Sequence, residues 1–163
     1  PGVCLRITNT YGPRHQMKHN RYGVLNWFIR LALDDETIPI FGDGRILRDF
    51  LYIDDLTAAL MQCGLTESAY GDLFNVGSGS PVSFLDLIDK IVRIAGGGHY
   101  EFAPFTAERK ALEPGDYWSD IAKIKAAVGW EPQVSLEEGL ERTIAYYRAC
   151  RDHYWTRGEV WKG

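Results

Sequence analysis

The chain has 163 residues, of which 45% are hydrophobic and 25% charged, and its formal net charge is −4. This composition is that of a globular unit and excludes disordered, collagen-like and small disulfide-rich proteins. No apolar run approaches the roughly 20 residues of a membrane-spanning helix, so no membrane partner is expected. Three scattered cysteines without metal-ligand spacing, and the absence of a signal-peptide pattern, predict a reduced, cytoplasmic protein.

The first half of the chain is predicted to alternate strands with helices. Short apolar or β-branched runs indicate strands, and apolar residues at helical spacing indicate helices. The expected elements are a buried strand at 3–8, a polar connection to about residue 23, a helix at 25–32, strands at 38–41 and 50–53 separated by a turn at 42–44, and a helix to about residue 63 capped by Asp54 or Asp55.

The second half continues this alternation. The expected elements are a strand at 73–76 with a turn at 77–79, a helix from Ser83 to 94 that stops before glycines 96–98, a strand at 100–102, a helix from Ser119 or Asp120 to Gly129, and a helix from the Ser135–Glu138 capping box to about residue 147. Such alternation is typical of an α/β fold with a partly parallel sheet. Because the first strand is predicted to be buried, the chain is expected to begin in mid-fold.

Basic residues cluster near the start of the chain. Residues 1–33 contain five Lys or Arg and no acidic residue, a charge of +5 against −9 for the remainder. In an acidic protein such a patch favours a small anionic ligand over nucleic acid, with chance clustering on a solvated loop as the alternative. The sequence also lacks an RNA-binding signature, so no nucleic-acid partner is expected.

Common cofactor and metal motifs are incomplete. The turn at 77–81 lies between a strand and a helix, but it has neither the third glycine of a GxGxxG loop nor the Lys-Ser/Thr of a P-loop. A structural turn is therefore favoured. His15 and His19 are four residues apart, in a stretch whose glycines and proline disfavour a helix, so no metal site is expected.

Residues suited to a nucleoside diphosphate follow the predicted strands. Asn9 lies just beyond the first strand, where ligands bind in α/β sheets. Arg48 follows a glycine turn, where a guanidinium can hold phosphate oxygens unless it pairs with Asp43 or Asp49. Phe41 adds a flat apolar surface. Together these residue types favour a nucleotide site.

Several segments resemble one family when taken in order. They are RITNTYGPR at 6–14, IPIFGDG at 38–44, RDFLYIDD at 48–55, LFNVG at 73–77, PGD at 114–116, GWEP at 129–132 and LEEGL at 136–140. The chain thereby resembles the extended short-chain dehydrogenases, the NAD-dependent nucleotide-sugar epimerase/dehydratase family. The likeness spans about residues 3–147 and corresponds to the C-terminal, substrate-binding half of such enzymes, close to the UDP-glucose 4-epimerases.

The resemblance implies an α/β fold, the C-terminal part of a Rossmann-like fold with a small mixed α/β substrate-binding domain. Residues 1–163 would form a single truncated unit. Within it, the resemblance implies remnants of the Rossmann sheet at 1–13 and about 50–80, a nucleotide-sugar-binding part at about 14–49 and 81–150, and a C-terminal tail at 151–163. The implied partners are a nucleoside diphosphate sugar and the missing N-terminal half.

The resemblance assigns roles to individual residues from their positions in the matching motifs. The resemblance implies substrate contacts from Asn9, Asn26, Ile40, Phe41, Arg48 and Asp116, with Arg48 on the pyrophosphate, and NAD contacts from Ile7, Thr8, Thr10 and Arg21. One position departs from the pattern. Galactose epimerases often have a second phosphate-binding arginine three residues before the Asp of PGD, and here that residue is Glu113. Either the loop turns differently or Arg109 substitutes.

The family's catalytic base is not found in these residues. A Tyr-x-x-x-Lys pair occurs nowhere in the sequence, so no catalytic residue is assigned and the chain alone is expected to be inactive. The resemblance favours a 4-epimerase, with a 4,6-dehydratase or a decarboxylase as alternatives. A non-catalytic nucleotide-binding or assembly module is the remaining hypothesis. The first strand is expected to seek a neighbour, as a homodimer or a domain swap.

Overall fold

The computed structural model describes residues 2–158 and forms eight strands in four pairs. Three pairs are parallel and one is antiparallel. The parallel pairs are β1 (Cys4–Ile7) with β6 (Leu73–Val76), β2 (Asn9–Tyr11) with β5 (Phe50–Tyr52), and β3 (Thr37–Phe41) with β8 (His99–Ala103); β4 (Leu47–Arg48) pairs antiparallel with β7 (Val82–Ser83). The mixed α/β fold with parallel strands is confirmed.

Helices follow or cover these strands, as the alternation predicts. They are α1 (Val24–Leu33), α2 (Ile53–Leu65), α3 (Phe84–Ala95), α4 (Ala107–Leu112), α5 (Ala122–Val128) and α6 (Leu136–Cys150), with short 3-10 turns at Glu67–Ala69 and Arg151–His153. None of the helices in the described part of the chain is long and apolar enough to cross a membrane.

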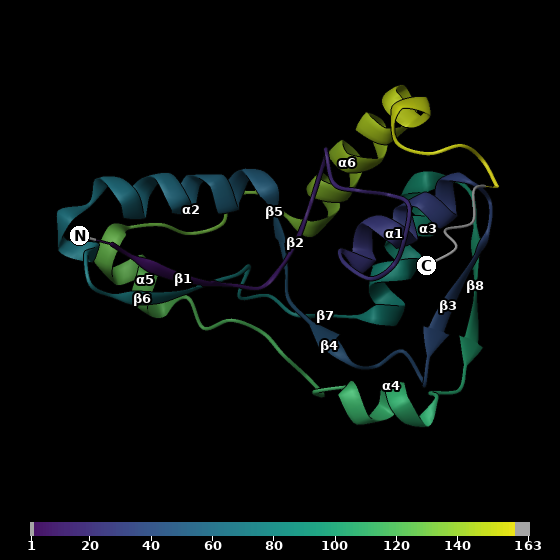
Figure 1. Ribbon diagram of the computed structural model, residues 1–163, viewed down its shortest axis with the longest axis horizontal. Helices are drawn as coiled ribbons and strands as arrows, with labels where there is room; N and C mark the ends of the chain where they lie inside the picture. The colour runs from purple at the N-terminus through teal and green to yellow at the C-terminus, as the bar shows by residue number, and fades with distance from the viewer. Residues whose placement is uncertain (1, 159–163) are drawn as a thin grey trace.

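The buried hydrophobic residues form two clusters, one towards each end of the molecule (Figure 1). The larger cluster joins α1, α3, α6 and β3, and the smaller joins α2, α5 and β6. β5 serves both, because successive side chains of a strand point to opposite sides. Phe50 and Tyr52 enter the larger cluster and Leu51 the smaller one. α5 therefore packs with α2 and β6. Part of the predicted tail, 159–163, lies outside the described residues.

Helix ends follow local capping chemistry at some positions and not at others. Ser83 accepts a hydrogen bond from the Asp86 N–H, and Ser135 accepts one from Glu138, as predicted for both capping boxes. The prediction that Asp54 or Asp55 caps α2 is wrong, because Tyr52 occupies that position without a side-chain cap. α5 likewise begins after Ile121 rather than at Ser119 or Asp120.

Asp55, which does not cap α2, has partners far along the chain. The Asp55 carboxylate accepts hydrogen bonds from the N–H groups of Gln133 and Val134, at 3.0 Å each, and the Asp55 carbonyl accepts one from the Trp130 indole at 3.1 Å. Because Asp55 is buried, these hydrogen bonds replace the hydration that its carboxylate has in the unfolded chain. They also fasten the segment after α5 to the start of α2.

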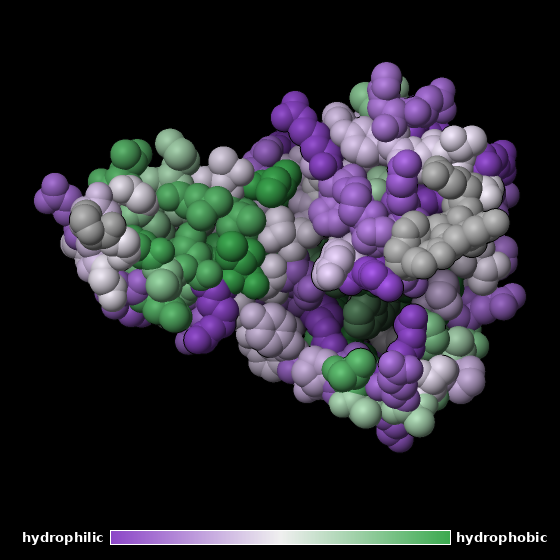
Figure 2. Space-filling view, viewed as in Figure 1, coloured by the Kyte–Doolittle hydropathy of each residue, from purple (hydrophilic) through white to green (hydrophobic). Residues whose placement is uncertain are grey.

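β1 is not the buried strand that its sequence predicts. Cys4, Arg6 and Ile7 are exposed, and Ile7 retains 42% of its surface. Val3 and Leu5 pack against the smaller cluster, so only one side of this segment is covered. Within residues 2–158, β1 pairs with β6 alone. The space-filling view shows a hydrophobic surface over this end of the molecule (Figure 2).

Asp49, between β4 and β5, joins three segments of the chain. It is fully buried, and its Oδ1 accepts hydrogen bonds from the N–H of Ser78 at 2.9 Å and from the Ser78 hydroxyl. Its Oδ2 accepts from the N–H groups of Gly79 at 3.4 Å and Ser119 at 3.0 Å. Its carbonyl accepts from the Thr8 hydroxyl at 2.9 Å. The glycine-rich turn is therefore a structural turn that binds an internal carboxylate.

Replacing this carboxylate should destabilise the whole chain. In Asp49→Asn one side-chain oxygen becomes an N–H donor that faces backbone N–H donors in either amide orientation. Either the Ser78 N–H, or the N–H groups of Gly79 and Ser119, then lack an acceptor, and we expect the free energy of unfolding to fall by about 1–3 kcal/mol. Urea denaturation of both proteins measures the difference. The control Asp54→Asn alters an exposed carboxylate and should cost less than about 1 kcal/mol. Equal losses would contradict this account.

Candidate functional site

An apolar hollow of about 290 Å³ opens beside α4. Its walls come from α1, β3, α3 and the segment around α4, and it is seen in Figure 2 as a recess with a hydrophobic floor. The lining residues are Asn20, Val24, Trp27, Phe28, Pro39, Ile40, Phe41, Ile46, Phe84, Ile88, Phe105, Arg109, Leu112 and Glu113. We call this recess the apolar hollow. Its size and apolar lining are those of a small-molecule site with few polar groups.

A second hollow of about 300 Å³ lies beside β2, and we call it the Asn9 hollow. It is lined by Thr8, Asn9, Thr10, His15, Gly23, Val24, Leu25 and Phe50. Val24, the first residue of α1, lines both hollows, so the N-terminal end of α1 lies between them. Such an end presents backbone N–H groups and the positive end of the helix dipole, which favour an anion.

The structure brings several predicted site residues to these hollows. Ile40 and Phe41 line the apolar hollow, and Thr8, Asn9 and Thr10 line the other. Each member of the second group also has an internal bond. The Asn9 amide donates to the Asp49 carbonyl at 3.4 Å, and the Thr10 hydroxyl donates to the Thr8 carbonyl at 3.3 Å. The predicted nucleoside and cofactor contacts are thus divided between two neighbouring recesses.

Asn26 does not take part in either recess. It is fully buried, and its side chain exchanges two hydrogen bonds with the Gly12 backbone, at 2.8 and 3.4 Å. The ligand contact predicted for this residue remains a prediction, and in this structure its amide is bonded inside the fold. Its sequence position at the start of α1 is as expected, but the side chain faces the 12–15 backbone instead of a hollow.

Three further predicted residues lie outside the lining of both hollows. Ile7 is exposed on β1, and Arg21 is exposed in the connection before α1. The Asp116 carboxylate accepts a hydrogen bond from the Leu47 N–H at 2.9 Å, which holds the loop after α4 against β4. The structure therefore does not gather these residues with the rest.

Arg48 pairs with a residue that the sequence did not suggest. Its guanidinium forms an ion pair with Glu113, and it donates to the carbonyls of Leu47, at 2.8 Å, and Gly115. The alternative partners Asp43 and Asp49 are wrong, because Asp43 pairs with Arg45 and Asp49 binds backbone N–H groups. The loop at 113–116 therefore turns so that Glu113 faces an arginine.

Sequence reasoning predicted Phe41 but missed the other aromatic walls of the apolar hollow, which are Trp27, Phe28, Phe84 and Phe105. Phe105 lies 6.0 Å from Phe41 between ring centroids, and a Cβ atom on Gly42 would come within 2.6 Å of the Phe105 ring. Gly42 has a positive φ of 73°, so it provides both the turn and the room for this ring. The only local signal was the glycine, since the two phenylalanines are 64 positions apart in the sequence.

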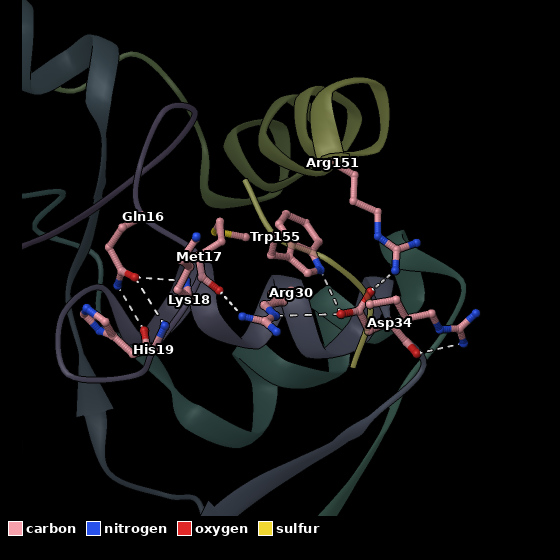
Figure 3. A network of polar contacts seen from close by, with 9 residues as sticks. Gln16, Met17, Lys18, His19, Arg30, Asp34, Arg151 and Trp155 are labelled. Carbon is pink, nitrogen blue, oxygen red and sulfur yellow. Dashed lines mark hydrogen bonds and ion pairs between the residues drawn. The ribbon is translucent and has the colours of Figure 1, made fainter. Parts of the chain in front are cut away.

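The connection between β2 and α1 is held from both sides. The Tyr147 hydroxyl accepts a hydrogen bond from the His15 N–H and donates to the His15 carbonyl, each at 2.9 Å. Arg30 donates to the Met17 carbonyl at 2.6 Å, and Asp34 accepts a hydrogen bond from the Trp155 indole at 2.8 Å (Figure 3). The bonds to His15 and Met17 fix the backbone of this connection, which borders the Asn9 hollow at His15.

Among residues 2–158, no group of three or more His, Cys, Asp or Glu is arranged to hold a metal ion. The polar chemistry of the two hollows consists of hydroxyl, amide, imidazole and guanidinium groups, with one carboxylate from Glu113. These groups suit a ligand that has hydroxyl and phosphate groups beside a flat apolar part.

Residues 1–77 match the model of the NAD dependent epimerase/dehydratase family. A low-salt glycan biosynthesis protein from Haloferax volcanii is 35% identical over 90% of this chain and 45% of its own length. Other curated relatives are named a dTDP-L-rhamnose 4-epimerase, UDP-glucuronic acid decarboxylases and a dTDP-glucose 4,6-dehydratase. The chain spans less than half the length of these relatives.

Solved structures confirm the fold. An epimerase from Methanothermobacter thermautotrophicus superposes with a TM-score of 0.86 at 28% identity, covering 93% of this chain and 44% of that protein. The UDP-glucuronic acid 4-epimerase from Bacillus cereus, solved with UDP-glucuronic acid and NAD, has a TM-score of 0.75 at 31% identity, covering 90% of this chain and 45% of that one. The mixed α/β arrangement is therefore that of Rossmann-like epimerase structures.

Alkaline pH should weaken the contact between Tyr147 and the loop. Burial is the main cause that raises the Tyr147 pKa from 10.0 to about 12, and burial also raises the Tyr11 pKa. A raised pKa means that the folded state favours the neutral phenol. This stabilisation is present below about pH 10 and is lost as pH rises towards 12.

We expect the free energy of unfolding to fall over this pH range, and to fall less steeply in Tyr147→Phe. Urea denaturation at several pH values between 9 and 12 measures both slopes. Tyr22→Phe, which removes an exposed hydroxyl, is the matched control and should keep the original slope. Identical slopes for Tyr147→Phe and the original chain would contradict the assignment.

Proposed function

We propose that this chain is the nucleotide-sugar-binding portion of an NAD-dependent epimerase/dehydratase. The observation that carries the proposal is that the apolar hollow and the Asn9 hollow adjoin at the N-terminal end of α1, where Val24 lines both. A nucleotide sugar has the same order of chemical groups, with a flat base, a diphosphate and a sugar. The family match and the nucleotide-sugar complex of a relative support this assignment.

Each part of the ligand has a suitable wall. In the proposal, Ile40 and Phe41 contact the base, because aromatic and aliphatic side chains favour a flat ring. The diphosphate lies near Val24, where α1 begins. Asn9 and Thr10 reach the sugar or the pyrophosphate from β2, since amide and hydroxyl groups bind such oxygens.

Within this class we propose a 4-epimerase rather than a 4,6-dehydratase or a decarboxylase. The names of two relatives support this choice, one a dTDP-L-rhamnose 4-epimerase and one a UDP-glucuronic acid 4-epimerase. Relatives named as decarboxylases and as a dehydratase are of similar identity, which makes these reactions the alternatives.

These residues do not provide a complete site for NAD. When bound, NAD supplies hydride transfer, and its pyrophosphate needs a free glycine-rich loop at a helix start. Here the N–H groups of Ser78 and Gly79 bind the Asp49 carboxylate, so the 77–81 turn cannot hold a phosphate. Thr8 and Thr10 line the Asn9 hollow, where we propose that they border the nicotinamide end.

The first experiment is a calorimetric titration of the 163-residue chain with UDP, GDP, CDP and dTDP. We expect saturable binding with a preference for one base. Phe41→Ala should weaken binding of that diphosphate about tenfold, because the base loses an aromatic wall. Phe102→Ala removes an exposed phenylalanine from β8 and is the matched control. The absence of binding by all four diphosphates would sink the proposal.

Turnover is a separate test. The 163-residue chain with NAD and UDP-glucose should show no epimerisation, because neither a Tyr-x-x-x-Lys base nor a dinucleotide loop is among its residues. Chromatographic detection of UDP-galactose after prolonged incubation measures this. Activity of the purified chain would contradict the proposal that it is the binding portion alone.

The exposed side of β1 should make the isolated chain associate with itself. Ile7 and Leu73, on paired strands, retain 42% and 43% of their surface, and an unpaired strand edge is a template for another strand. Light scattering at rising concentration should show a dimer, and Ile7→Lys should shift the distribution towards the monomer. A single monomeric species at high concentration would contradict this expectation.

A further inference from the structure

A buried carboxylate stands at the C-terminal end of α1, where the helix itself disfavours it. The Asp34 side chain is fully buried and directly follows the last residue of α1. A negative charge at this position faces the negative end of the helix dipole. The partners of Asp34 therefore account for its position, because a buried carboxylate has to be paired and hydrogen-bonded.

These partners come from α1 and from residues 151–155, which follow α6 and which we call the post-α6 segment. The Asp34 Oδ2 accepts a hydrogen bond from the Trp155 indole at 2.8 Å and lies 3.7 Å from the Arg30 Nε. The Asp34 Oδ1 forms an ion pair with Arg151 (Figure 3). One residue of α1 is thus joined twice to a segment more than 110 positions away in the sequence.

Arg30 connects this network to both hollows. It is buried, with 3% of its side chain exposed, and it lines neither hollow. It donates to the Met17 carbonyl at 2.6 Å, in the connection that supplies His15 to the Asn9 hollow and Asn20 to the apolar hollow. Its guanidinium carbon also lies 4.9 Å from the ring centroid of Trp27, a wall of the apolar hollow. One guanidinium therefore supports parts of both recesses from inside the fold.

The Trp155 N–H fixes the carboxylate that faces Arg30. Of the two contacts at the Asp34 Oδ2, the indole bond at 2.8 Å has the length of a hydrogen bond, whereas the Arg30 Nε at 3.7 Å is held there by charge. The Arg30 guanidinium carbon also lies 5.8 Å from the Trp155 ring centroid. The indole therefore sets the position of the carboxylate, and the carboxylate and the ring together set the position of the guanidinium.

We propose that Asp34 and Trp155 are positioning residues for the ligand site, and that the post-α6 segment determines how firmly the connection at 12–23 is held. The inference rests on the proposed function and assigns a remote control of affinity to the same site. Without the Trp155 N–H, the Asp34 carboxylate is free to turn. Arg30 then follows the carboxylate, and the Met17 carbonyl loses its fixed donor. A ligand would have to order the connection on binding, which lowers affinity.

The test removes one hydrogen bond at a time from the post-α6 segment. Trp155→Phe deletes the indole N–H and keeps an aromatic ring. The matched control Tyr154→Phe deletes the hydroxyl that bonds to Tyr146 at 2.6 Å and leaves the contacts of Asp34 in place. Each 163-residue variant is titrated with the diphosphate that the unaltered chain binds best among UDP, GDP, CDP and dTDP. Amide hydrogen exchange without ligand, followed by mass spectrometry, compares the peptides of 12–23 with those of α2.

The connection contains N–H groups that report on its order. Those of Gly12 and His15 bond to the side chains of Asn26 and Tyr147, at 3.4 and 2.9 Å. Exchange of such groups speeds up when the segment that contains them opens locally. α2 packs in the smaller cluster, away from this network, and is the internal reference.

We expect Trp155→Phe to speed exchange in 12–23 at least threefold, to leave α2 unchanged and to weaken the diphosphate about threefold to tenfold. Tyr154→Phe should leave both exchange and affinity within about twofold. If circular dichroism shows that Trp155→Phe does not fold, Arg151→Gln replaces it. This variant removes the more exposed partner of the same carboxylate, and the same directions are expected.

The two readouts separate positioning from stability. If Trp155→Phe speeds exchange in α2 as much as in 12–23, or speeds exchange in 12–23 while affinity stays within twofold, Trp155 has a structural role alone and the inference is wrong. Equal losses of affinity in Trp155→Phe and Tyr154→Phe would also contradict it. These results leave the proposed function standing. If the unaltered chain binds none of the four diphosphates, the proposed function fails, and the effect on affinity fails with it.

Discussion

The buried carboxylate of Asp49 is the interaction on which the rest of this structure depends. It lies where the chain passes from β4 to β5, and it binds the turn after β6 and the segment before α5. Because its carbonyl also accepts from Thr8, the junction of β1 and β2 is held at the same point. A single residue thus sets the position of both hydrophobic clusters, since β5 contributes side chains to each of them.

The two hollows follow from this arrangement. β2 pairs with β5 next to Asp49, which places Asn9 beside Phe50 at the wall of one hollow. β3 and α1 form the wall of the other, and α1 begins at the border between them. The intervening connection has little regular structure, yet bonds to Tyr147 and Arg30 hold its backbone in place. The proposed ligand site is therefore built on rigid supports from several parts of the chain.

Several charged side chains near the apolar hollow also have their partners inside the fold. Arg48, the predicted phosphate ligand, forms an ion pair with Glu113, the residue that departs from the family's motif. The Asp116 carboxylate accepts a backbone N–H. Motif position placed all three residues in one region correctly, because PGD and RD segments are local patterns. It could not show that Glu113 turns towards Arg48, since that depends on how a loop 65 residues away packs on β4. The cation that remains exposed to the hollow, Arg109, comes from α4, a helix that no periodicity predicted.

Sequence alone determined the elements whose signals are local. The Ser83 and Ser135 capping boxes, the glycine ends of α3 and α5, and the short apolar strands depend on residues within about four positions of each other. Tertiary structure decided which polar side chains remain for a ligand. Asn26 and Asp55 look like helix-start residues, yet one binds Gly12 and the other Gln133 and Val134. β1, predicted to be buried, has one side exposed, because burial depends on which distant elements pack against a strand and not on its own composition.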